Sequence, residues 1–247
     1  MLPLILSILL SFGCSDESIY SPNEMVQDST QVTVDSIQDV SEIRRISFLA
    51  LGDSYTIGQS VAESERWPNQ LRDQINTNFD SLRIVGVNII ARTGWTTQDL
   101  NSALNNENIT GTYDLVSLLI GVNNQYRGYP IEDYPNEFKN LLTRAISYAG
   151  GKSEHVFVVS IPDYGYTPFG ESNQEKISSD IDAYNVINKR IADEYGINYY
   201  NITPISRDGL NKPELVASDN LHPSGEQYKL WVEKIIADEN FHQLLNK

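Results

Sequence analysis

The chain has 247 residues, of which 33 are acidic and 18 basic, so its formal net charge at neutral pH is −15. Residues 1–43 contain 7 of the acidic residues and no Lys or Arg, which leaves residues 44–247 with a net charge of about −8. This excess of negative charge disfavours nucleic acid and anionic membrane surfaces as partners. About 200 residues suffice for one sizeable hydrophobic core, so the sequence predicts a single folded domain over residues 44–247.

The N-terminal segment differs in composition from the rest of the chain. Residues 1–13 are rich in Leu and Ile. They are too short to span a bilayer, which takes roughly 20 residues, and they fit the apolar core of a secretory signal peptide. Cys14 follows and is the only cysteine, so it cannot form an internal disulfide. A small residue followed by Cys at the end of a signal resembles a bacterial lipoprotein cleavage site, which implies lipidation of Cys14. The alternative is an ordinary signal peptide that contains a cysteine.

Residues 14–43 carry Ser, Asp, Glu and Gln with few large apolar side chains. Such a segment cannot bury enough apolar surface to offset the entropy lost on ordering, so we predict a disordered acidic tether. With a lipidated Cys14, this organisation predicts an extracytoplasmic protein of the bacterial envelope, in the periplasm or at the cell surface. Its lipid anchor would be its only contact with the membrane.

Strands and helices alternate along the rest of the chain. Apolar and β-branched segments predict strands over residues 46–51, 82–91, 113–120, 155–161 and 197–202. Helical spacing and capping signals predict helices that begin at Trp67, Thr97 and Ser224, and others over residues 134–149 and 178–195. The nearly continuous apolar character of residues 82–91 predicts a strand covered on both faces. The alternation predicts an α/β fold, a three-layer α/β/α sandwich on a parallel sheet.

The first predicted strand ends abruptly in Gly52-Asp53-Ser54. In an α/β domain such a turn lies at the carboxyl edge of the sheet, where ligands bind. The Ser54 hydroxyl is therefore a candidate nucleophile. We interpret Gly52 and Asp53 as structural, one forming a tight turn and the other accepting a hydrogen bond that fixes the loop. A serine hydroxyl is a weak nucleophile without an adjacent base.

His222 is the strongest candidate for that base. It lies on a predicted loop with Asp219 three residues before it. This spacing lets the carboxylate hold one ring nitrogen while the other faces Ser54. His155 is expected at the opposite edge of the sheet as a surface or strand-cap residue, and His242 is expected to be solvated on the last helix. The alternative is that Asp219 and His222 only cap the helix that follows.

Acyl transfer also needs donors for the developing oxyanion. The candidates are the backbone N–H groups of Ser54 and Gly94 and the side-chain amide of Asn123, each of which follows a predicted strand. Glycine lets the backbone approach a ligand closely, although Gly94 is also compatible with a plain turn. Asn123 supplies a neutral donor, although it also suits an Asx-turn that satisfies its own loop.

Taken together, these positions resemble the SGNH (GDSL) hydrolase family. The family's four blocks correspond in order to Gly52-Asp53-Ser54, Gly94, Gly121-Val122-Asn123-Asn124 and Asp219-Asn220-Leu221-His222-Pro223. The resemblance covers residues 46–240 and implies a serine ester hydrolase on a flavodoxin-like sandwich with a parallel five-stranded sheet. It implies Ser54 as nucleophile, His222 as base and Asp219 as orienting acid. The implied oxyanion hole consists of Ser54, Gly94 and Asn123.

Two positions depart from the family pattern. Tyr55 stands where the eponymous motif has Leu, which is common variation. Asn124 stands where the third block usually has Asp. This second departure puts a supporting hydrogen bond near the site in question but leaves the Asn123 donor in place.

The implied activity leaves the substrate open. A lysophospholipase or short-chain acyl esterase is one class, and a carbohydrate O-acetylesterase is the other. Six loop aromatics suit acyl-chain burial and sugar stacking alike: Trp95, Tyr126, Tyr129, Tyr164, Tyr166 and Phe169. We favour the general acylhydrolase, acting on small-molecule or glycan esters. A non-catalytic binding lipoprotein is the remaining alternative, and the intact Ser, Asp and His set argues against it.

Other site classes find no support in the sequence. The chain has no Gly-x-Ser-x-Gly nucleophile elbow and no glycine-rich phosphate loop of Walker or Rossmann type. No His, Cys, Asp and Glu cluster has the spacing of metal ligands. We therefore predict an enzyme without cofactor or metal, and the sequence indicates no particular oligomeric state.

Overall fold

A computed structural model describes residues 43–107 and 109–245. The predicted signal peptide, Cys14 and all but the last residue of the predicted tether lie outside this part of the chain. The described residues form a parallel five-stranded sheet with the strand order β2-β1-β3-β4-β5. The strands are β1 (Arg44–Gly52), β2 (Leu82–Ala91), β3 (Leu115–Leu119), β4 (Val156–Val159) and β5 (Asn198–Tyr200). The predicted α/β fold and parallel sheet are confirmed.

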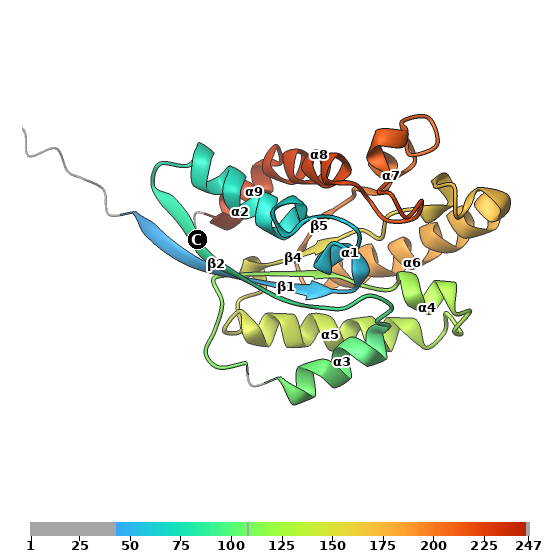
Figure 1. Ribbon diagram of the computed structural model, residues 1–247. Helices are drawn as coiled ribbons and strands as arrows, with labels where there is room; N and C mark the ends of the chain where they lie inside the picture. The colour runs from blue at the N-terminus through green and yellow to red at the C-terminus, as the bar shows by residue number, and fades with distance from the viewer. Residues whose placement is uncertain (1–42, 108, 246–247) are drawn as a thin grey trace, which may run out of the picture. The chain divides into compact units, whose positions relative to one another are not determined.

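Helices cover both faces of this sheet (Figure 1). One layer contains α2 (Trp67–Asn78), α8 (Gly225–Ile236) and α9 (Glu239–Leu245). The other contains α3 (Thr97–Asn106), α5 (Tyr134–Tyr148) and α6 (Gln174–Glu194). Three short helices follow strands: α1 (Ser54–Ile57), α4 (Val122–Tyr126) and α7 (Thr203–Ser206). The three-layer sandwich is thus confirmed, and α4 occupies a segment that the sequence had indicated only as the end of a strand.

The sequence signals explain most of these boundaries. Pro68 stands in the first turn of α2, where its missing N–H costs no helical hydrogen bond. The Ser224 hydroxyl caps α8 by accepting a hydrogen bond from the backbone N–H of Gln227. Gly196 follows α6 with a positive φ of 66°, which glycine adopts without steric cost. None of the helices in the described part of the chain is both long and apolar enough to cross a membrane.

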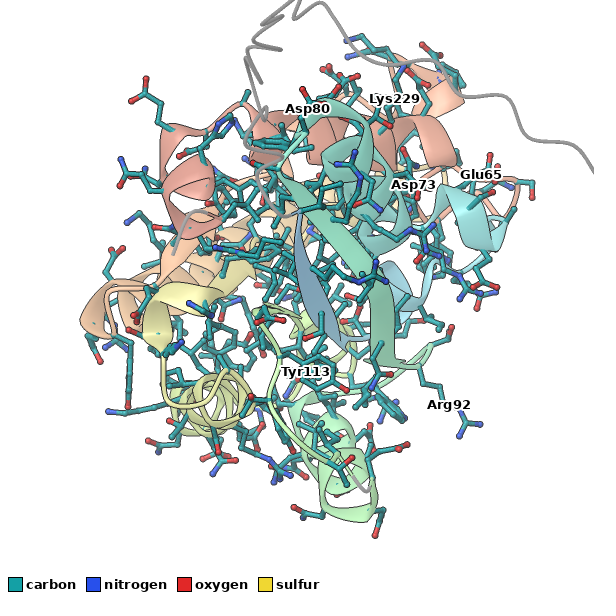
Figure 2. All side chains as sticks on the ribbon, turned by 90° about the vertical axis from the view of Figure 1, so that its left-hand side faces the viewer. Glu65, Asp73, Asp80, Arg92, Tyr113 and Lys229 are labelled. Atoms are coloured by element: carbon teal, nitrogen blue, oxygen red, sulfur yellow. The ribbon has the colours of Figure 1, made fainter. Side chains whose placement is uncertain are left out.

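The position of β2 corrects one prediction. Residues 82–91 do form a strand, but it lies at the edge of the sheet and is not covered on both faces. Val85 is 52% exposed, and Gly86 beside it is exposed as well. Figure 2 is seen from the end of the domain where the strands begin, and Arg92, which follows β2 at the other end of that strand, extends away from the fold. The continuous apolar run therefore predicted a strand correctly, but it did not indicate that both faces of that strand are covered.

The core between the sheet and the α2/α8/α9 layer is aromatic. Phe48 on β1 and Phe157 on β4 have ring centroids 6.1 Å apart, and Trp67 at the start of α2 lies 6.1 Å from Phe48. All three side chains are fully buried. Large aromatic rings bury much apolar surface each, so this cluster holds α2 against the strands whose carboxyl ends carry the candidate site residues.

Candidate active site

Ser54 lies directly after β1, at the first residue of the short helix α1. The turn before it is tight. A Cβ on Gly52 would lie 2.2 Å from the Thr56 hydroxyl oxygen and 2.6 Å from the Leu119 carbonyl oxygen. No side chain fits at such distances, so a glycine here lets the turn between β1 and α1 lie close against the end of β3. The predicted structural role of Gly52 is confirmed.

Asp53 caps α1 beside the serine. Its Oδ1 accepts a hydrogen bond of 3.0 Å from the backbone N–H of Tyr55, as predicted for a residue that fixes the loop. The side chain is fully buried, and Oδ2 has no hydrogen-bond partner among the described residues. Burial raises the pKa of Asp53 to about 7, against the opposing effect of backbone hydrogen bonds from Tyr55 and from its own N–H. Burial thus favours the neutral form of the carboxyl group next to Ser54.

His222 and Asp219 form the predicted pair. Nδ1 of His222 lies 2.6 Å from Oδ2 of Asp219. Oδ1 of Asp219 accepts hydrogen bonds from the backbone N–H groups of Leu221, at 3.0 Å, and His222, at 2.9 Å. Asn220 between them adopts a φ of +64°, a conformation that Asn tolerates better than most residues. The Asp219 side chain therefore holds both the loop and the ring of His222.

Ser60 completes this arrangement and was not predicted. It follows α1 with a φ of +68°, and its hydroxyl donates a hydrogen bond of 2.6 Å to Oδ2 of Asp219, across 159 positions of the sequence. Burial alone would raise the pKa of Asp219. The hydrogen bonds from Ser60, Leu221 and His222 outweigh that effect and hold this pKa well below its usual range. Nothing in the sequence near Ser60 marks it, because its partner belongs to a different part of the chain.

A cavity of about 250 Å³, here called the Ser54 cavity, brings the predicted residues together. Ser54, Gly94, Asn123 and His222 all line it, although they come from four separate segments. Apart from Thr93, its remaining lining is apolar or aromatic: Tyr55, Val122, Tyr126, Tyr164, Phe169 and Leu221. The hydrogen bonds of the described residues include none between the Ser54 hydroxyl and the His222 ring. Such catalytic hydrogen bonds are often long without substrate and tighten when it binds.

The two other oxyanion candidates are held by neighbouring loops. Nδ2 of Asn123 donates a hydrogen bond of 3.0 Å to the Trp95 carbonyl oxygen, which uses one of its two N–H groups. Gly94 has a φ of +85°, and its carbonyl oxygen accepts a hydrogen bond from the Arg127 guanidinium. Both contacts join the loop after β2 to the segment after β3, so the two candidate donors keep a fixed spacing.

Asn124, which departs from the family pattern, is buried, and both its side-chain oxygen and its side-chain nitrogen form hydrogen bonds. Its Oδ1 accepts from the backbone N–H of Thr97 at 3.0 Å. Its Nδ2 donates to the Thr97 hydroxyl at 2.7 Å and to Oε2 of Glu137 at 3.2 Å. The Thr97 hydroxyl also donates to Glu137. An amide fits here because a carboxylate at position 124 would face that of Glu137. Asn124 thus satisfies both ends of its side-chain amide at this position, next to the carboxylate of Glu137.

The other two histidines lie away from this cavity. His155 comes directly before β4, at the opposite end of the strands, and is buried rather than exposed. His242 on α9 is exposed, with its ring against Phe79. Within residues 43–107 and 109–245, no group of three or more His, Cys, Asp or Glu side chains is arranged to hold a metal ion.

Comparisons with known proteins agree with this geometry. The model of the GDSL-like Lipase/Acylhydrolase family matches residues 50–230. An arylesterase of Vibrio mimicus is 26% identical over 195 residues, which cover 77% of this chain and 86% of the relative.

Solved structures share the fold. An acetylxylan esterase of Geobacillus stearothermophilus has a TM-score of 0.60 at 18% identity, with 81% of this chain and 96% of that chain covered. An esterase of a Pseudoalteromonas species, solved in a form inhibited by monoethylphosphonate, has a TM-score of 0.56 at 17% identity, with 82% and 100% covered. The structure of TesA has a TM-score of 0.62 at 16% identity, with 81% and 99% covered.

The family model spans most of the chain, including Ser54, Gly94, Asn123, Asp219 and His222. The chain therefore belongs to the GDSL-like Lipase/Acylhydrolase family and is a serine ester hydrolase.

The contact between Asn124 and Glu137 leads to a prediction about stability. Asn124→Asp places two carboxylates together, which raises the folded-state pKa of one of them above its unfolded value. The protonated pair keeps its stability at low pH, and that stability is lost as the pH rises through the raised pKa. We expect the variant to lose about 1–3 kcal/mol of unfolding free energy relative to wild type at pH 8, and clearly less at pH 4.5.

The measurement is urea unfolding of both proteins at the two pH values. The double variant Asn124→Asp/Glu137→Gln exchanges the amide and the carboxylate and should recover most of the loss at pH 8. A loss of equal size at both pH values, or no recovery in the double variant, would contradict the charge argument.

Proposed function

We propose that the chain cleaves carboxylic esters through an acyl-enzyme on Ser54. The observation that carries this proposal is the convergence of Ser54, His222, Gly94 and Asn123 on one cavity, with the Asp219 carboxylate against the His222 ring. Nucleophile, base and oxyanion donors are the groups that acyl transfer requires.

In this mechanism Oγ of Ser54 attacks the ester carbonyl carbon while Nε2 of His222 takes the hydroxyl proton. Asp219 accepts the Nδ1–H hydrogen bond and stabilises the imidazolium that forms. The negative charge on the carbonyl oxygen is met by the N–H groups of Ser54, Gly94 and Asn123. The tetrahedral intermediate then expels the alcohol, which receives the proton from His222. Water repeats the sequence on the acyl-enzyme, releasing the carboxylic acid and restoring the Ser54 hydroxyl.

The dimensions of the Ser54 cavity support a short acyl group. Its volume of about 250 Å³ is below the roughly 300–1,000 Å³ that is usual for ligand pockets, and its lining is mostly apolar. A long fatty acyl chain would extend beyond it. We therefore favour a short-chain acyl esterase over a lysophospholipase. The name of the Vibrio relative, arylesterase, and the phosphonate inhibition of the Pseudoalteromonas esterase are consistent with a serine esterase of this kind.

A carbohydrate O-acetylesterase is the second candidate, and the aromatic loops favour it. Of the six loop aromatics singled out in the sequence, Tyr126, Tyr164 and Phe169 line the Ser54 cavity, whereas Trp95, Tyr129 and Tyr166 do not. Tyr126 is 59% exposed and Phe169 is 49% exposed. Rings of this kind at the mouth of the cavity suit the face of a sugar that carries an acetyl group.

The proposed roles predict the behaviour of two variants. Ser54→Ala and His222→Ala should each lower kcat by at least about 10³-fold on p-nitrophenyl acetate, because the members of such a set act as a unit. The assay uses p-nitrophenyl esters from acetate to laurate, with the highest kcat/KM expected at the short end. A fluorophosphonate probe should label wild type and should not label Ser54→Ala.

Ser81→Ala is the control, since Ser81 is exposed and lies in the turn before β2. It should keep the wild-type rate and labelling. Retention of activity or of labelling by Ser54→Ala would remove Ser54 from the mechanism.

Ser60 should act as a positioning residue for Asp219. Ser60→Ala and Ser60→Gly both remove the 2.6 Å hydrogen bond, and glycine also relieves the strain of the positive φ. We expect both variants to lower kcat by about 3- to 10-fold, the worth of one net hydrogen bond, with KM nearly unchanged. Full activity in Ser60→Gly together with a loss in Ser60→Ala would show that backbone strain, and not the hydrogen bond, is what matters.

We further propose attachment to the bacterial envelope through a lipidated Cys14, supported by the apolar run before it and the acidic segment after it. Cys14→Ser should release the protein from the membrane fraction of expressing cells and abolish incorporation of a labelled fatty acid. Fractionation with detergent and with salt separates lipid attachment from adsorption. Membrane attachment that persists in Cys14→Ser would reject lipidation.

A further inference from the structure

A larger cavity of about 660 Å³, here called the α6 cavity, adjoins the Ser54 cavity. It lies between α4, the residues that follow α4, the loop of residues 164–173 and the first half of α6. Figure 1 shows α4 and this half of α6 at the end of the domain where the strands end. Tyr126, Tyr164 and Phe169 line both cavities, so one aromatic wall separates them.

This wall is a cluster of three rings. The ring centroid of Tyr126 lies 6.2 Å from that of Tyr164 and 6.2 Å from that of Phe169. The centroids of Tyr164 and Phe169 are 6.3 Å apart. The backbone N–H of Phe169 donates to the Asn220 carbonyl oxygen at 3.1 Å, which ties the wall to the loop that carries His222. Tyr129, 39% exposed, adds a fourth aromatic side chain on the α6 side. The α6 cavity therefore offers flat apolar faces beside the reacting centre.

The α6 cavity also has polar lining, which is connected to the aromatic wall through Tyr164. The Tyr164 hydroxyl donates to Oε1 of Gln125 at 2.8 Å, and Nε2 of Gln125 donates to Oδ2 of Asp180 at 3.0 Å. Lys176 pairs with the same carboxylate oxygen at 2.6 Å. Burial alone would raise the pKa of Asp180, but the hydrogen bonds from Lys176 and Gln125 hold it below its ordinary value, so Asp180 is ionised. Glu132 brings a second carboxylate to the lining.

We propose that the α6 cavity binds the alcohol part of the ester and that this alcohol is a neutral sugar. The proposal rests on the proposed function, because it assigns the ester's two halves to two cavities. Aromatic faces pack against the C–H faces of a sugar ring, and carboxylate, amide and phenol groups exchange hydrogen bonds with its hydroxyls. The volume of about 660 Å³ lies within the usual range for ligand pockets.

The charges of the α6 cavity select against the other alcohol classes. A phosphate-bearing alcohol, as in a lysophospholipid, would meet Glu132 and Asp180, and its one cationic partner, Lys176, is already paired. Like charges at short range are unfavourable. A purely apolar alcohol or a second acyl chain would remove water from these charged groups without replacing its hydrogen bonds.

The test uses three acetyl esters that differ only in the alcohol: ethyl acetate, methyl 6-O-acetyl-glucoside and 1-acetylglycerol 3-phosphate. We expect kcat/KM for the glucoside to exceed that for ethyl acetate by at least about tenfold, because binding energy from the remote part of a substrate accelerates the reaction. The phosphate ester should be the slowest of the three. p-Nitrophenyl acetate reports whether the esterase itself is active.

A matched pair of variants locates the effect. Asp180→Ala removes a hydrogen-bond acceptor in the α6 cavity. It should lower the ratio of kcat/KM for the glucoside to kcat/KM for ethyl acetate by about fivefold or more. It should also raise kcat/KM for the phosphate ester relative to ethyl acetate. Asp193→Ala removes the same kind of partner from an equivalent Lys–Asp pair on α6, Lys189–Asp193, also at 2.6 Å, which lines neither cavity. It should leave the ratio unchanged.

The outcomes separate the two proposals. Equal kcat/KM for the glucoside and ethyl acetate, or equal ratios in wild type and Asp180→Ala, overturns the sugar site while hydrolysis of p-nitrophenyl acetate upholds the esterase. A preference for the phosphate ester overturns the sugar site in favour of a lipid-type alcohol. No hydrolysis of any of the four esters overturns the proposed function and the sugar site with it.

Discussion

The reversal of strand order at β1 is the constraint on which the site depends. From β1 the chain moves outward to the edge strand β2 and then returns across β1 to β3. In such a sheet the connections after the two neighbouring strands leave toward opposite faces, and a crevice opens between their carboxyl ends. Ser54 follows β1 and Asn123 follows β3, so the two residues flank that crevice. The remaining loops, including the one that carries His222, close around it.

Polar contacts over long sequence separations give this crevice a defined geometry. Asp219 accepts hydrogen bonds from Ser60 and from His222 at once, which joins the loop after α1 to the loop before α8. Asn124 and Glu137 join the segment after β3 to the start of α3 and to α5. Asn124 and Thr97 are both buried, and a buried polar network is stable only when its members are satisfied. Residues such as Ser60 and Glu137, which line no part of the Ser54 cavity, therefore help to fix the geometry of the site.

The two adjoining cavities differ in size and chemistry. The smaller Ser54 cavity is mostly apolar, and the larger α6 cavity is lined by both aromatic rings and charged groups. An acetylated sugar has a small apolar acyl group and a polar alcohol, and the three aromatic rings that line both cavities lie between two spaces that differ in the same way. If the acyl group binds in the Ser54 cavity and the alcohol in the α6 cavity, residues of α4 and α6 determine which alcohol is preferred. These residues are separate from those that carry out acyl transfer.

The sequence by itself determined the α/β fold and the succession of strands and helices along the chain. It also gave the candidate residues Ser54, Gly94, Asn123, Asp219 and His222. Strand ends, caps and short-range motifs are local signals, so they can be read without the tertiary structure. The sequence predicted cover on both faces of residues 82–91, which is wrong for this edge strand, because an apolar run looks alike in central and edge strands and only the pairing distinguishes them. Only the tertiary structure decided three features: the contact of Ser60 with Asp219, the contact of Asn124 with Glu137, and the α6 cavity. Each of them depends on contacts between segments brought together by folding, and no spacing along the chain encodes such a meeting.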